Sequence, residues 1–183
     1  MKNLLPRITP IDNPKNLLSK ITFWYLKKEF GKVTMPAKVI YSRFPKIGLL
    51  TKKIFDIESS FKNTNKEIRL LIQCLVASIN GCSFCIDISK KNAQKKSILL
   101  DKFENLMNFK DNELFTVKEI IILTYVKEMT ENITVNDLIY DNLKTHCGNN
   151  EIIEITFVAS TENYLNRLIK PLNIGSDELC SIK

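Results

Sequence analysis

The most constraining stretch of this sequence runs from about residue 66 to residue 79, where apolar side chains occupy nearly every side of a predicted helix. They are Ile68, Leu70, Leu71, Ile72, Cys74, Leu75, Val76 and Ala77. A helix that is apolar all round lies in the interior of a protein. Asn80 and Gly81 then interrupt it, and a second helix is predicted from about Cys82 toward Leu100. We therefore expect these two helices to form a central hairpin.

The rest of the chain also favours helices. Only 5 glycines and 6 prolines occur in 183 residues, and the alternating patterns of strands are scarce. The other expected helices cover about residues 19–30, 36–44, 46–61, 117–132, 134–146 and 151–169. Thr64 with Glu67, and Thr116 with Glu119, have the spacing of capping boxes at two of the helix starts. The sequence thus predicts an all-α fold.

The chain has 183 residues, the length of one domain of ordinary size. Since 44% of these residues are hydrophobic, the chain can bury a substantial core. We expect a single domain over residues 1–183. Three prolines should keep residues 1–18 extended as an N-terminal arm, and residues 171–183 follow the last helix as a tail. The three prolines are Pro6, Pro10 and Pro14.

Composition also limits the location and the partners. No apolar run is long enough for a signal peptide or a membrane span, so we expect a cytoplasmic protein that does not bind membranes. The formal net charge is +7, which could attract nucleic acid. The lysines are spread along several helical faces, however, so no nucleic-acid partner is predicted.

Cys82 and Cys85 form a CxxC motif at the start of the second hairpin helix. In a chain without an export signal, such a pair indicates redox chemistry or metal binding rather than a structural disulfide framework. Two cysteines at this spacing place both sulfurs on one side of the helix, close enough to bond. The helix N-terminus would favour the thiolate form. The motif therefore predicts a dithiol that can cycle with a disulfide.

A metal site is the alternative interpretation of the CxxC motif. Zinc would need two further ligands, and there is no second CxxC motif. The remaining candidates are Cys74, His146, Cys147 and Cys180. Because His146 and Cys147 are neighbours, they point in different directions if they lie on a helix. We therefore expect neither a metal nor a cofactor.

The segment Asn80-Gly81-Cys82-Ser83-Phe84-Cys85-Ile86-Asp87 resembles the signature of the carboxymuconolactone decarboxylase superfamily, specifically its alkylhydroperoxidase AhpD-like branch. The preceding apolar helix, the segment Phe30-Gly31-Lys32-Val33 and the region from Glu151 to Arg167 extend the resemblance over most of the chain. The resemblance implies an AhpD-like helical fold with the CxxC at the apex of the central hairpin. It also implies a homo-oligomer, commonly a trimer or hexamer, that reduces hydroperoxides with its thiols.

The resemblance assigns different roles to the two cysteines. Cys85 would attack the peroxide and become a sulfenic acid, and Cys82 would resolve it to a disulfide. An external dithiol reductant would then restore the thiols. Two positions depart from the family pattern. The histidine four residues after the second cysteine is Ser89 here, and the glutamate twelve residues before the first cysteine is Leu70.

Because neither serine nor leucine is a base near neutral pH, another group would have to serve as a proton relay. The candidates in this sequence are Glu67, Ser89, Asp87 and His146. Each has a structural interpretation as well. Glu67 fits a capping box, Asp87 is acceptable as a solvated or capping residue, and His146 is acceptable at a surface.

Three functions are compatible with these observations. The first is a thiol-dependent peroxidase that contributes to antioxidant defence. The second is a degenerate, non-catalytic homo-oligomer of the same fold, with a structural or partner-binding role. The third is a lactone decarboxylase, as in the branch that names the superfamily. That branch does not depend on a CxxC, so the presence of Cys82 and Cys85 argues against it.

Overall fold

The computed structural model describes residues 5–98 and 100–181, and within them it contains helices and loops without a β-strand. The α-helices are α1 (Leu17–Phe30), α2 (Pro45–Ser59), α3 (Lys66–Ile79), α4 (Ser83–Lys95), α5 (Asp101–Glu104), α6 (Val117–Asn132), α7 (Asp137–His146) and α8 (Asn149–Ile169). A π-helix, η1 (Ala37–Tyr41), and the 3-10 helices η2 (Leu106–Asp111), η3 (Lys170–Leu172) and η4 (Leu179–Ser181) complete them. The all-α prediction is confirmed.

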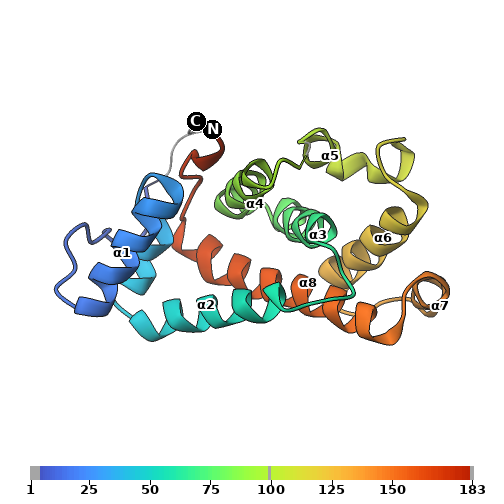
Figure 1. Cartoon of the computed structure of the whole chain (residues 1–183), viewed down its shortest axis with the longest axis horizontal. Helices are drawn as coiled ribbons and strands as arrows, with labels where there is room; N and C mark the ends of the chain where they lie inside the picture. The colour runs from blue at the N-terminus through green and yellow to red at the C-terminus, as the bar shows by residue number, and fades with distance from the viewer. Residues whose placement is uncertain (1–4, 99, 182–183) are drawn as a thin grey trace.

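Helix α3 lies in the middle of the molecule, and α4, α6 and α8 pack around it (Figure 1). Its residues 70–77 are all buried, as the apolar pattern predicted. The main core extends from α3 to apolar side chains of α6 and α8, such as Leu123, Val126 and Ile155. Because α3 and α4 follow each other antiparallel in this core, the predicted central hairpin is confirmed (Figure 1).

Two predicted details of the helix boundaries are wrong. Asn65 caps α3, because its Oδ1 accepts a hydrogen bond of 2.8 Å from the amide of Ile68, so Thr64 and Glu67 form no capping box. Helix α4 ends at Lys95 instead of continuing toward Leu100, because the chain turns there and Ser97 adopts a φ of 55°. The second capping box is confirmed by the reciprocal bonds of Thr116 and Glu119.

The first described residues lie against the segment that follows α8. Residues 5–16 form no helix, and the amide of Arg7 donates a hydrogen bond of 2.9 Å to the carbonyl of Leu172. The side chain of Asn173 donates one of 2.8 Å to the carbonyl of Leu5. Beyond η3, the chain returns over α4, where Leu179 is fully buried. None of the described helices has both the length and the apolar character needed to cross a bilayer.

Candidate active site

The turn that carries the CxxC motif requires a glycine. Gly81 has a φ of +65°, which residues with a side chain rarely adopt. This conformation lets the amide of Cys82 donate a hydrogen bond of 2.8 Å to the carbonyl of Ala77, so the chain reverses immediately after α3. Cys82 thereby becomes the N-cap residue of α4. The Asn80-Gly81 pair thus places the first cysteine at a helix N-terminus.

Cys82 and Cys85 are joined by a disulfide, with their Cα atoms 5.3 Å apart. The two sulfurs therefore lie within bonding reach in the folded chain, as their spacing predicted. Cys85 is in the first turn of α4, where the free backbone amides and the helix dipole stabilise negative charge.

The disulfide is closed off from solvent by segments that are distant in sequence. Cys82 is 0% exposed and Cys85 is 3% exposed. They belong to an apolar cluster that also contains Val39, Ile40, Ala77, Phe84, Ile169, Ile174 and Leu179. Among these, Ile174 and Leu179 come from the C-terminal tail, so this tail forms part of the cover over the disulfide.

Asp87 holds this tail in place. Its carboxylate is 7% exposed and accepts hydrogen bonds of 2.8 Å from the Ser176 hydroxyl and 2.9 Å from each of the Leu179 and Cys180 amides. A second acid, within the tail itself, also fixes this segment, since Asp177 Oδ2 accepts a bond of 2.6 Å from the Met35 amide. The structure thus gives Asp87, a candidate relay residue, the role of an anchor.

The other candidate relay residues lie in different environments. Ser89 is buried on the hairpin, at 3% exposure. Leu70, which replaces the glutamate of the family pattern, is also buried there, at 5% exposure. Glu67 is in the first turn of α3 and forms an ion pair of 2.8 Å with Lys102. About 18 Å of helix separates Glu67 from the C-terminal end of α3 at 1.5 Å per residue. The structure therefore does not bring Glu67 to the disulfide.

His146 is also remote from the disulfide. It is exposed at the C-terminal end of α7, which packs against α6 and α8 (Figure 1). Its Nδ1 atom lies 2.7 Å from the Thr145 hydroxyl and 3.1 Å from the carbonyl of Asn142. These local contacts agree with the structural interpretation of His146 as a surface residue.

The three cysteines outside the CxxC motif are unbonded. Burial raises the pKa of the Cys74 thiol to about 11. Burial, followed by the charge of Glu151, does the same to the pKa of Cys147. These two thiols thus stay protonated at neutral pH and are poor nucleophiles. Cys180 is half-buried on the tail beside Asp87.

Sequence reasoning missed a buried acid near the turn. Glu162 of α8 is 6% exposed and accepts a hydrogen bond of 2.6 Å from Asn166, whose side chain also contacts Asn80. Burial raises the pKa of Glu162 to about 8. The available signal was its spacing, because Glu162 lies four residues before Asn166 in an apolar helix.

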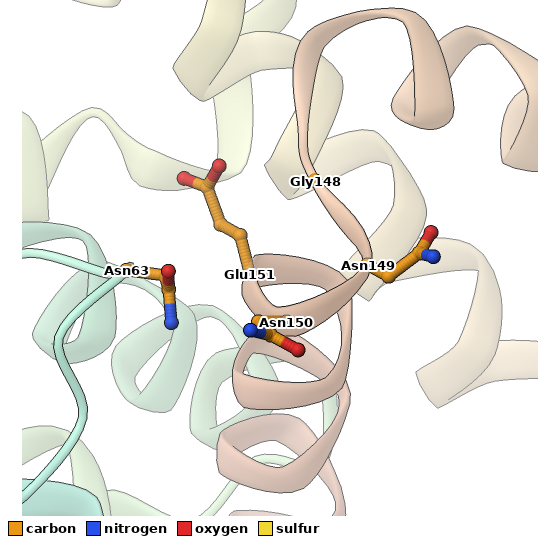
Figure 2. A pocket seen from close by; sticks show the side chains of 5 residues that line it. All are labelled: Asn63, Gly148, Asn149, Asn150 and Glu151. Carbon is orange, nitrogen blue, oxygen red and sulfur yellow. The ribbon is translucent and has the colours of Figure 1, made fainter.

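A shallow polar hollow is present elsewhere on the surface, with a volume of about 440 Å³. It lies where α8 begins, and Asn63, Gly148, Asn149, Asn150 and Glu151 line it (Figure 2). No cysteine of the CxxC motif contributes to it. In the part of the chain that the structure describes, no three His, Cys, Asp or Glu residues are placed to bind a metal ion together.

Comparison with curated proteins finds distant relatives of similar length. The chain is 23% identical over 161 residues to the uncharacterized protein YnjA of Escherichia coli, and this alignment covers 87% of the chain and 88% of YnjA. It is 25% identical over 142 residues to the uncharacterized protein YdfG of Bacillus subtilis, covering 73% of this chain and 92% of YdfG. No protein-family model matches the chain.

Comparison with solved structures finds the same fold over nearly the whole chain. An uncharacterized peroxidase-related protein from Silicibacter has a TM-score of 0.82 at 19% identity, covering 98% of this chain and 97% of its own. The debrominase Bmp8 has a TM-score of 0.81 at 15% identity, with coverage of 95% and 94%. An AhpD-core, peroxidase-related protein from Ralstonia eutropha has a TM-score of 0.73 at 15% identity, with coverage of 94% and 96%. The chain therefore has the same fold as these peroxidase-related and AhpD-core structures.

Proposed function

We propose that this protein is a thiol-dependent peroxidase that reduces hydroperoxides through Cys85 and Cys82. The observation that carries the proposal is the Cys82–Cys85 disulfide at the N-terminus of α4, within an AhpD-like fold. Cys74 and Cys147 are separate, unbonded thiols, and burial raises the pKa of each to about 11.

The proposed cycle has three balanced steps. The Cys85 thiolate attacks the hydroperoxide, the O–O bond breaks, and a proton from solvent converts the leaving oxygen to an alcohol. Cys85 is then a sulfenic acid. The Cys82 thiol attacks its sulfur, which forms the disulfide and releases water. An external dithiol reduces the disulfide by exchange and is itself oxidised to a disulfide.

We also propose that the protein works as a homo-oligomer, a trimer or a hexamer. Support comes from α1 and α2, which present large apolar side chains to solvent. They are Leu17, Ile21, Trp24, Tyr25, Leu49, Leu50, Phe55 and Ile57. An apolar surface of this kind is typical of an interface between subunits.

Turnover of a hydroperoxide tests the proposed activity. The reduced wild-type protein should consume tert-butyl hydroperoxide with dithiothreitol as the reductant. Cys85→Ser should lower this rate at least 100-fold, because it removes the attacking sulfur. Cys147→Ser is the matched control and should keep the wild-type rate, since that thiol stays protonated. Activity that survives in Cys85→Ser would refute the assignment.

The alternative is a non-catalytic protein of the same fold. It is favoured by Leu70 and Ser89 at the two relay positions, and by the distance of Glu67 and His146 from the disulfide. This alternative predicts no consumption of the hydroperoxide by the wild-type protein. A brominated pyrrole, tested as a second substrate, would show whether the protein removes bromine instead, the activity named for the structural neighbour Bmp8.

A further inference from the structure

Helix α8 carries polar side chains on the face that packs against α3. Glu162 and Asn166 lie one turn apart and are 6% and 0% exposed, and Lys170 continues the same row at the end of the helix. Asn163 is the neighbour of Glu162 in the sequence. We refer to Glu162, Asn163, Asn166 and Lys170 together as the α8 row. Burying such groups is costly unless each has a hydrogen-bond partner.

Three members of the α8 row, Asn163, Asn166 and Lys170, bond to the two residues immediately before Cys82. The side-chain Nδ2 of Asn80 donates hydrogen bonds of 2.9 Å to Asn166 Oδ1 and 3.0 Å to Asn163 Oδ1. Lys170 Nζ donates a bond of 2.8 Å to the carbonyl of Gly81. Asn80 is thus held by α8, and Gly81 is held by Lys170 directly after α8.

Glu162 supports this contact from behind. The side-chain nitrogen of Asn166 donates a hydrogen bond of 2.6 Å to Glu162 Oε1. This bond fixes the orientation of the Asn166 amide, with its oxygen directed at Asn80. Glu162, Asn166 and Asn80 therefore form a continuous chain of hydrogen bonds that ends two residues before Cys82.

We infer that Glu162, Asn166 and Asn80 are positioning residues that hold Cys82 in the geometry the Cys82–Cys85 disulfide needs. The inference rests on the proposed cycling of this pair and names the residues that support it. Cys82 directly follows the turn at Gly81, whose φ of +65° glycine adopts readily, so the position of Cys82 depends on the contacts that restrain this turn. Loosening the turn would lower the effective concentration of one sulfur at the other and destabilise the disulfide.

The charge of Glu162 adds a pH dependence to this arrangement. Burial, together with the charge of Glu58 on α2, raises the pKa of Glu162 to about 8. Its charge also acts on Cys74 of α3, which Lys90 of α4 influences with the opposite sign, and Arg69 of α3 acts on Glu58. Glu162 is thus mostly neutral at pH 7, and its ionisation above pH 8 places a buried negative charge at the inner end of this chain of hydrogen bonds.

The experiment measures the equilibrium of the disulfide with dithiothreitol at pH 7, which requires no peroxide. Asn80→Ala should shift this equilibrium toward the dithiol about tenfold, equal to about 30 mV for a two-electron couple. Thr156→Val is the matched control. Thr156 lies on α8, and the substitution removes its hydrogen bond to Tyr125 of α6 without touching the turn. Equal shifts in both variants, or none in Asn80→Ala, would overturn the inference.

A second variant keeps the inference testable if Asn80→Ala does not fold. Glu162→Gln retains an oxygen that accepts from Asn166 and removes the ionisation. Alkylation of the reduced Cys82 and Cys85, followed by mass spectrometry, should proceed equally in wild type and variant at pH 7. At pH 9 the variant should react about threefold faster, because the buried charge of Glu162 no longer opposes the thiolates. Identical pH profiles would contradict the role of Glu162, whereas a wild type without peroxidase activity would contradict only the proposed function.

Discussion

Replacing Glu154 with alanine is expected to lower the free energy of unfolding by about 4 kcal/mol, as is typical when a buried charged network loses one partner. Glu154 of α8 is 7% exposed and binds the loop between α2 and α3. Its carboxylate accepts bonds of 2.7 Å from the Thr64 amide, 2.9 Å from the Thr64 hydroxyl and 2.7 Å from the Asn63 side chain. The amides of Lys62 and Asn63 donate to it as well, at 3.2 and 3.1 Å. Alanine would leave several of these donors without a partner.

The hydrogen bonds of Glu154 also make its contribution to the free energy of unfolding depend on pH. Burial alone would raise the pKa of Glu154, but the hydrogen bonds from Asn63 and Thr64 outweigh it and lower the pKa to about 2. Because the folded-state pKa lies below the unfolded value of 4.5, the stabilisation is complete above pH 4.5 and is lost as the pH falls toward 2.

Urea unfolding at several pH values measures both effects. The difference between wild type and Glu154→Ala should be largest near pH 7 and should shrink between pH 4.5 and 2. Asp56→Ala is the control, because it removes a surface ion pair with Lys52 and should cause no measurable change. A stability of Glu154→Ala equal to that of Asp56→Ala at pH 7 would show that the loop does not depend on this carboxylate.

Asp87→Ala is expected to make the Cys82–Cys85 disulfide at least tenfold faster to reduce with dithiothreitol. The substitution removes the acceptor of three hydrogen bonds that hold residues 176–180 on α4. Opening this tail withdraws Leu179 and Ile174 from the cluster that covers the disulfide. Since exchange requires access of the attacking thiolate to a sulfur, the rate should follow the exposure of the pair.

Two further variants separate local opening from general loss of stability. Ser176→Ala removes one of the three bonds and should accelerate reduction only slightly. Glu154→Ala destabilises the fold at the loop between α2 and α3, and should leave the reduction rate near that of the wild type. An unchanged rate in Asp87→Ala would mean that the tail does not control access to the disulfide.

The central hairpin could be predicted from the sequence because its signals are local. Helix α3 is apolar on every side, and Asn80-Gly81 interrupts it at the required place. The spacing of Cys82 and Cys85 then sufficed to predict that their sulfurs lie within bonding reach. These features depend on neighbouring residues, which the sequence displays directly.

The features that were missed depend on contacts between distant residues. Thr64 and Glu67 have the spacing of a capping box, but Glu154 binds the Thr64 hydroxyl from 90 residues away and Lys102 binds Glu67. Asp87 likewise bonds to amides 92 and 93 residues away. No local sequence pattern predicts such partners, because the tertiary packing of the helices brings them together.

The central claim is that Cys85 attacks the peroxide, and trapping its sulfenic acid tests this claim most directly. Reduced Cys82→Ser, which lacks the resolving thiol, should be mixed with one equivalent of hydroperoxide in the presence of dimedone, without a reductant. Our account predicts a dimedone adduct on Cys85, located by mass spectrometry of the digested protein. An adduct on another cysteine, or an unmodified Cys85 with the peroxide intact, would contradict it.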